Sequence, residues 1–259
     1  MEIARAEEGS KGFKRVFAFL RDRLLDGTLQ PGDRLIAERD VAIQLGVSRP
    51  LVREALRALS MLGIVEIRDR VGTIVRRPDV SFLRDFLTLA LAQQKSLMDD
   101  VMEGRIAIEC QAVRMACERA TISDFERFQR AVVRIGETID ELDAGAVADF
   151  EFHRAIVLAA RSETLLVLYD SMAALLANSH RVRRELVDKF PSLKIDVVDD
   201  HKRVFDALVA RDPDRAEAVL RQHLAIGDEY RHRAATEIGD VSLPVPARAG
   251  GGRQSGDLF

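Results

Sequence analysis

The stretch LGVSRPLVREAL (residues 45–56) constrains the fold more than any other part of the 259-residue chain. Gly46 interrupts a helical pattern, and Ser48 can cap the next helix, because a serine hydroxyl accepts hydrogen bonds from free backbone N–H groups. Pro50 suits the first turn of that helix, where a missing N–H costs little. An apolar stripe follows, made of Val52, Ala55, Leu56 and Leu59. The stretch therefore predicts two helices joined by a tight turn.

The flanking sequence extends this pattern into a small domain. Residues 13–25 form an amphipathic helical pattern, and a short helix follows the turn at residues 30–33. After Gly63 the period changes to alternation, and IVEIR (64–68) and TIVRR (73–77) indicate two short strands joined by DRVG. Residues 12–77 are therefore predicted to form a winged helix-turn-helix.

Basic residues gather in this segment. Arg49, Arg53 and Arg57 recur every four residues, so they share one helix face. Residues 34–77 hold nine arginines against five acidic residues, although the whole chain has a net charge of −3. Arginine binds guanine edges bidentately and also binds phosphates. Such arginines can alternatively form an ordinary solvated face, and Arg57 can pair with Glu54. The basic hairpin, with Arg68, Arg70 and Gly72 at its tip, favours contact with double-stranded DNA.

After residue 80 the sequence predicts only helices, at about 80–93, 96–119, 122–142, 145–160, 163–188, 192–211 and 213–236. Residues 80–236 are therefore expected to form a second, all-helical domain, and residues 239–259 have the composition of a disordered tail. The fold class is mostly α, with an N-terminal winged helix-turn-helix and a C-terminal helical bundle.

Several features point to the cytoplasm. The N-terminus has no apolar core of signal-peptide length, and the most apolar run, FLTLALA, is too short to span a membrane. Cys110 and Cys117 lie about 10 Å apart along a helix, which is too far for a disulfide and suggests two buried thiols.

Four residues of the second domain have the chemistry of metal ligands. Asp149 and His153 lie four apart on one helix face, and His201 and His223 belong to two later helices. Carboxylate and neutral imidazole suit zinc, nickel or manganese, and such side chains can converge in a bundle core. The alternatives are a surface Asp–His pair and two hydrogen-bonded core histidines. The other two histidines, at positions 180 and 232, lie in arginine-rich stretches and are expected at the surface.

The segment PGDRLIAERDVAIQLGVSRPLVREALRALSMLGIVEIRDRVGTIV resembles the N-terminal domain of GntR-family transcription regulators. The match is long, running from PG-x-x-L through GVSR-x-x-VREAL to a glycine-tipped wing. The resemblance implies DNA contacts by Arg39, Ser48, Arg49, Arg53 and Gly72. Val71 stands where some members have a basic residue beside the tip glycine, so the charge of the wing is assigned to Arg70.

Residues 80–236 resemble the FCD effector domain of the FadR-like branch of that family. The similarity lies in GRIAIE, DFEFH, HKRVFDAL and AEAVLRQHL, whereas RSET (161–164) departs from the small-Gly-Asn turn of relatives. It implies a divalent metal, zinc being favoured over nickel or manganese, held by Asp149, His153, His201 and His223. A small carboxylate effector would complete the coordination.

Three further side chains are assigned to the effector cavity. Arg105 is expected to contact the effector carboxylate, or alternatively to pair with Glu109 four residues on. Asn178 and Ser179 interrupt an apolar helix and are expected to line the same cavity.

The resulting hypothesis is a transcription regulator that binds a palindromic operator as a homodimer, with an affinity set by the effector. It is neither an enzyme nor a membrane protein. Two alternatives remain: a metalloenzyme fused to a DNA-binding module, and a regulator that binds an acyl-CoA-type ligand without metal.

Overall fold

The computed structural model describes residues 2–78, 80–92, 94, 97–189 and 193–237; side chains of residues 2–10, 186–187, 189, 193 and 226–237 are outside this description. The predicted tail, 239–259, lies outside the described residues. The chain divides into two compact units, Met1–Leu87 and Thr88–Phe259. The division falls inside a helix, some residues after the predicted end of the DNA-binding domain at residue 77. Each unit is considered by itself.

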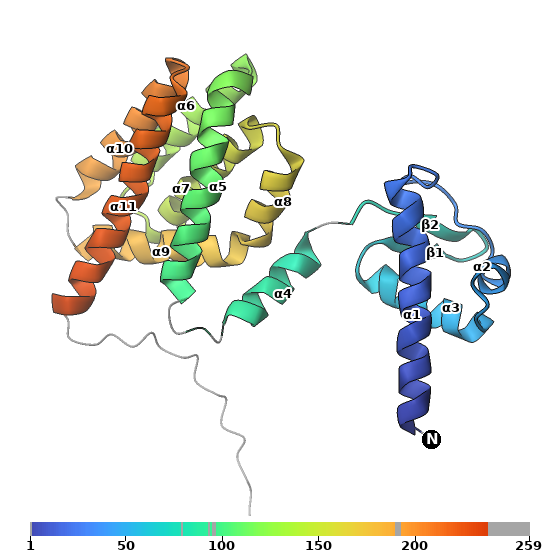
Figure 1. Ribbon diagram of the computed structural model, residues 1–259. Helices are drawn as coiled ribbons and strands as arrows, with labels where there is room; N and C mark the ends of the chain where they lie inside the picture. The colour runs from blue at the N-terminus through green and yellow to red at the C-terminus, as the bar shows by residue number, and fades with distance from the viewer. Residues whose placement is uncertain (1, 79, 93, 95–96, 190–192, 238–259) are drawn as a thin grey trace, which may run out of the picture. The chain divides into compact units, whose positions relative to one another are not determined.

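The first unit is a winged helix-turn-helix (Figure 1). Its helices are α1 (Glu2–Leu25), α2 (Glu38–Leu45) and α3 (Arg49–Met61), and its antiparallel strands are β1 (Val65–Arg68) and β2 (Gly72–Val75). α1 begins at Glu2, eleven residues before the apolar stripe predicted, because polar residues continue the helix beyond the packed part. A core formed by Val16, Leu20, Val41, Val52, Leu56, Leu59 and Val65 joins these elements.

The turn between α2 and α3 follows the prediction at Gly46 and differs at Ser48. Gly46 has a φ of 60°, in the left-handed region that glycine enters without strain. Ser48 precedes α3 in an extended conformation, but its side chain makes no capping hydrogen bond. The Ser48 hydroxyl is therefore exposed and not engaged by its own helix.

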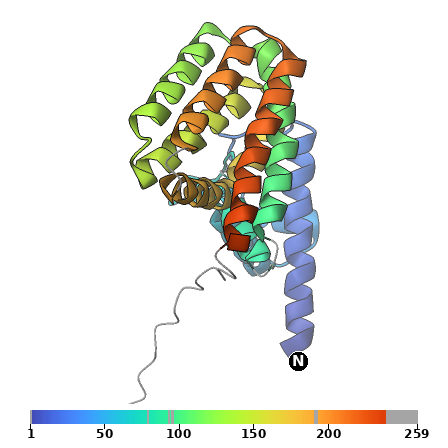
Figure 2. The same ribbon diagram turned by 90° about the vertical axis from the view of Figure 1, so that its left-hand side faces the viewer.

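The second unit begins within α4 (Ser81–Leu91) and consists otherwise of α5 (Leu97–Arg119), α6 (Ile122–Glu137), α7 (Leu142–Ala159), α8 (Glu163–Ser171), α9 (Ala173–Lys189), α10 (Leu193–Val209) and α11 (Pro213–Glu237). In both views α5 and α11 run side by side, and α9 crosses near one end of them (Figures 1 and 2). α7 is largely enclosed, with ten buried residues.

Three of the predicted helices were wrong in extent. The pattern at 122–142 ends at Glu137, and α7 starts at Leu142 instead of residue 145. The segment 163–188 forms two helices because the first ends at Ser171, and the N–H of the next residue, Met172, bonds Tyr169 O. The Ser171 hydroxyl also bonds Leu168 O at 2.7 Å, and no glycine or proline marks this break in the sequence.

The end of the bundle near residue 120 is held by arginine side chains. Arg211, with a φ of 52°, donates to Cys117 O and Ala120 O, the free carbonyls at the end of α5. Arg161, with a φ of 51°, donates to the buried carboxylate of Asp124. Cys110 and Cys117 are free and buried, as expected.

Candidate metal centre and nucleic-acid interface

Four potential ligands converge inside the helical unit. Asp149 and His153 come from α7, His201 from α10 and His223 from α11, and one ligand atom from each lies within 4.8 Å of the others. Asp149 Oδ1 lies 3.3 Å from the Nε2 atoms of both His153 and His201. His153 Nε2 and His223 Nε2 are 3.2 Å apart. The four residues are buried, which excludes the alternative of a surface Asp–His pair.

Neighbouring groups fix the orientation of two of the histidine rings. Nδ1 of His153 lies 2.6 Å from Glu109 Oε2, and Nδ1 of His201 lies 2.7 Å from Val197 O. Since both partners are acceptors, each Nδ1 carries the proton, and each Nε2 presents a lone pair towards Asp149 and the other ligands. This is the arrangement in which histidine ligates metals.

Burial determines the protonation of the cluster. It lowers the pKa of His201 and of His223, so both rings are neutral at pH 7. For Asp149, burial alone would raise the pKa, but His180 and His201 outweigh it and hold the pKa of the carboxyl well below its usual range. A carboxylate beside neutral imidazoles is the state that binds a divalent cation.

The donor set fits a divalent ion by its chemistry and by one unused atom. Asp149 Oδ2 is buried and has no hydrogen-bond partner among the described residues. Three imidazole nitrogens and a carboxylate oxygen suit zinc, and nickel or manganese also accept them. The four residues can therefore hold such an ion.

His180 lies beside Asp149 and His153 of the cluster, and its expected surface position was wrong. Its side chain is fully buried, and its Nδ1 lies 2.9 Å from Asp149 Oδ1, although the contact is not aligned as a hydrogen bond. Burial lowers the pKa of His180 to about 3, so its ring is neutral. The side chain of His232, the other histidine expected at the surface, lies outside the described residues.

Arg105 and Asn178 differ in position. Arg105 on α5 is buried, and its Nε donates to Glu109 Oε1 at 2.7 Å, which is the predicted alternative partner. Asn178 is exposed, contrary to its expected place in the cavity, because the inward face of α9 carries Leu176, His180 and Arg184. Ser179 is buried and contacts Met102 Sδ at 3.4 Å.

The exposed face of α3 carries the predicted DNA-contacting residues. Ser48 and Arg49 are exposed at its N-terminus, and Arg49 makes no ion pair within the described part of the chain. Arg53 donates twice to Glu38 Oε2, at 3.1 and 3.0 Å, and so links α3 to α2. Arg39 on α2 pairs with its neighbour Asp40 at 3.3 Å.

The wing presents Arg70 at its tip. Arg70 has a φ of 62° and Gly72 a φ of 108°, so the turn between β1 and β2 is left-handed at both residues. Arg68 is paired with Glu66 of the same strand at 2.9 Å. Arg70 has no ion-pair partner among the described residues and is exposed, which leaves its charge available to an external anion.

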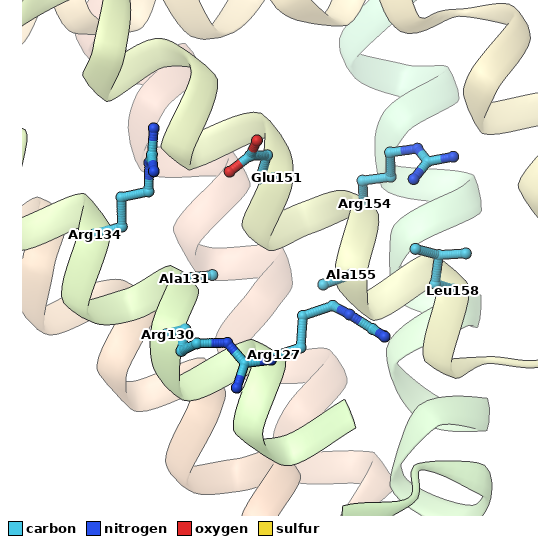
Figure 3. A pocket seen from close by; sticks show the side chains of 8 residues that line it. All are labelled: Arg127, Arg130, Ala131, Arg134, Glu151, Arg154, Ala155 and Leu158. Atoms are coloured by element: carbon cyan, nitrogen blue, oxygen red, sulfur yellow. The ribbon is translucent and has the colours of Figure 1, made fainter. Parts of the chain in front are cut away.

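A hollow of about 400 Å³ on the second unit lies apart from the buried cluster. Four arginines line it between α6 and α7, together with Glu151, Ala131, Ala155 and Leu158. Two of these arginines already bind carboxylates, Arg127 that of Asp124 and Arg154 that of Asp170. Their guanidinium groups do not converge on one point (Figure 3), which is typical of a solvated surface.

A winged helix-turn-helix with an exposed basic helix, joined to a helical unit with a buried ligand cluster, defines a class of protein: a DNA-binding transcription regulator. The comparisons identify the family. Residues 13–75 match the bacterial regulatory proteins of the gntR family, and residues 100–226 match the FCD domain. The chain belongs to the gntR family of regulators and carries an FCD domain.

Individual relatives agree with this assignment. The HTH-type transcriptional regulator LutR of Bacillus subtilis (strain 168) is 32% identical over 77% of this chain and 91% of LutR. The putative L-lactate dehydrogenase operon regulatory protein of Escherichia coli (strain K12) is 31% identical over 81% of this chain and 86% of its own length. These relatives are regulators, so the chain is not an enzyme, as expected.

A solved structure shows the same fold. Streptococcus agalactiae GntR has a TM-score of 0.58 and 20% identity, covering 86% of this chain and 100% of that one. Within the described residues, no helix is both long and apolar enough to cross a membrane.

Proposed function

We propose that this regulator senses a small carboxylate at a divalent metal centre held by Asp149, His153, His201 and His223. The observation that carries the proposal is the convergence of four buried ligand atoms from three helices within 4.8 Å. Zinc is the favoured ion because the set is dominated by imidazole nitrogen, and nickel or manganese would also fit. A relative named for an L-lactate dehydrogenase operon supports a carboxylate as effector.

The ligands come from α7, α10 and α11, so an ion bound there ties three helices together. An effector can alter operator affinity only if it binds the two arrangements of the regulator unequally. The helices that carry the ligands also form the core of the unit. A shift of these helices on effector binding would therefore change the packing of the whole unit. All four ligand positions carry side chains that can bind a metal, and all four are buried. This argues against the alternative of an acyl-CoA-type ligand bound without metal.

On the DNA side, we assign operator contacts to Arg39, Ser48, Arg49, Arg53, Arg70 and Gly72. One recognition helix covers only a half-site, so the functional form is a homodimer on a palindromic operator. Such a regulator acts where the bacterial chromosome lies, in the cytoplasm.

The test removes one ligand at a time. In His201→Ala and His223→Ala, bound metal should fall and the effector response should disappear, while operator binding without effector persists. Metal content is measured on purified protein before and after chelation, and operator binding by fluorescence anisotropy. A folded wild-type protein that never holds a divalent ion, and whose effector response ignores the chelator, would contradict the proposal.

A further inference from the structure

Arg184 on α9 is a buried cation whose hydrogen-bonding groups are unused. Its side chain is 2% exposed. None of its three nitrogens has a hydrogen-bond partner among the described residues, and its nearest carboxylate oxygen, Asp149 Oδ2, lies 3.7 Å from Nε. A buried polar group without a partner is destabilising, and a charged one is more so. We therefore expect the N–H groups of Arg184 to meet a hydrogen-bond acceptor when the protein functions.

The fold makes room for this guanidinium. Gly145 on α7 faces Arg184, and a Cβ placed there would lie 3.2 Å from both Cζ and Nε of Arg184 and 2.8 Å from Thr138 O. An alanine would therefore crowd the guanidinium against the helix. The absence of a side chain at residue 145 keeps Arg184 beside Asp149.

A second buried arginine, linked to the centre through Glu109, also has unused donors. Nη2 of Arg105 is buried and without a hydrogen-bond partner in the described part of the chain, although its Nε is bonded to Glu109. Arg184 offers five N–H groups and Arg105 Nη2 two more. A single carboxylate has two oxygens, and one of them would be taken by the metal in the proposed function. The donors therefore exceed what a monocarboxylate can accept.

The charges lead to the same conclusion. Glu109 balances Arg105, and Asp149 balances Arg184. Beside His223, the buried Asp200 already pairs with Arg203, and the half-buried Arg183 contacts the His223 ring. A divalent cation then adds two positive charges that nothing buried offsets, and uncompensated buried charge is costly.

We infer that the effector is a short dicarboxylate, with one carboxylate at the metal centre and the other on Arg184 and the free Nη2 of Arg105. Arg184 lies within 3.7 Å of a proposed metal ligand, so only a few bonds can separate the two carboxylates. The inference rests on the proposed function, because it assigns the substrate class of the same site.

The experiment compares L-malate and succinate with L-lactate and acetate, each titrated calorimetrically into zinc-loaded protein. The dicarboxylates should bind about tenfold or more tightly than the monocarboxylates, the difference expected from one charge-assisted hydrogen-bonded pair. Arg184→Met should abolish that preference by weakening dicarboxylate binding, with monocarboxylate binding changed by less than about threefold. Arg181→Met is the matched control, because Arg181 lies on the exposed face of α9, and it should keep the preference.

Circular dichroism and zinc content verify each variant, and Arg184→Lys replaces Arg184→Met if the latter does not fold. Lysine keeps the charge but not the planar fork, so it should weaken dicarboxylate binding less. Equal affinity for L-lactate and L-malate, or equal losses for both in the Arg184 variant, would overturn the inference and leave the proposed function standing. Failure of all four carboxylates to bind zinc-loaded protein would overturn both.

Discussion

Glu109 Oε2 lies 2.6 Å from Nδ1 of His153, and the other oxygen of the same carboxylate accepts from Arg105. Burial alone would raise the pKa of Glu109, but Arg105 and His153 lower it to about 2, so the group is ionised. It thus fixes the tautomer of a proposed ligand and at the same time neutralises a buried cation.

We therefore expect Glu109→Gln to weaken metal binding by about 10–100-fold, the usual effect of removing such an orienting carboxylate. The variant should also be less stable, because Arg105 loses its buried counter-charge. A chelator competition titration measures the affinity. Glu103→Gln, an exposed substitution on the same helix, is the control and should retain wild-type affinity. Unchanged affinity in folded Glu109→Gln protein would remove Glu109 from the centre.

The sequence predicted the DNA-binding unit well because its determinants are local. A glycine turn, a proline in the first helical turn and a change of period each specify backbone conformation within a few residues. It also named the four clustered ligands, although their spacing alone did not distinguish a metal site from hydrogen-bonded core histidines. The structure brings their ligand atoms together.

The inward face of α9 could not be predicted in the same way. Apolar periodicity finds buried faces, but this face carries His180 and Arg184 as well as Leu176. Polar residues on it look like a solvated surface until the other helices are in place. The end of α8 before Met172 was also hard to predict, because no glycine or proline marks it in the sequence.

Arg49 and Arg53 are expected to act differently on DNA binding. Arg49→Ala should weaken operator binding while stability changes by less than about 0.5 kcal/mol, since the side chain is exposed. Arg53→Ala should weaken operator binding and cost up to about 1 kcal/mol, because it also breaks the partly exposed pair with Glu38. Anisotropy titrations at several salt concentrations and urea unfolding measure the two effects.

Glu38→Gln separates the two roles of Arg53. If Arg53 contacts DNA, releasing it from Glu38 should leave operator affinity equal or higher. If it only joins α2 to α3, Glu38→Gln should weaken binding as Arg53→Ala does, and the assigned contact is wrong. A phosphate contact further predicts that Arg53→Ala reduces the salt slope by about one.

Gly72 is expected to matter for the shape of the wing. Its φ of 108° is strained for any L side chain, and an added Cβ would lie 3.1 Å from Arg34 Nε. Gly72→Ala should cost about 1–3 kcal/mol of local strain and displace Arg70, which weakens operator binding. Gly27→Ala is a matched control, because Gly27 also has a positive φ, 78°, but open space around it. Equal operator affinity in the two variants at matched folded fractions would show that the wing does not contact DNA.

Asp124 should make the stability of the second unit depend on acid pH. Its buried carboxylate accepts from Thr121 N at 2.9 Å, from Arg127 at 2.8 Å and from Arg161, so it joins the start of α6 to the turn that follows α7. Burial alone would raise its pKa, but the Thr121 hydrogen bonds and the two arginines outweigh this and lower the pKa. Asp124→Asn should destabilise the unit by about 1–3 kcal/mol at pH 7.

The sign of the pH effect follows from the lowered pKa. The unfolded chain binds a proton near its ordinary pKa of about 3.9, whereas the folded chain resists protonation to lower pH. The stabilisation by Asp124 is therefore complete above that value and lost as pH falls through the folded pKa.

Urea unfolding at pH 7, 5 and 3.5 tests this. The difference in the free energy of unfolding between wild type and Asp124→Asn should be the same at pH 7 and 5 and smaller at pH 3.5. Glu126→Gln, exposed on the same helix, should differ from wild type by less than about 0.5 kcal/mol throughout. A difference for Asp124→Asn that grows towards low pH would mean that the carboxyl is protonated in the folded protein.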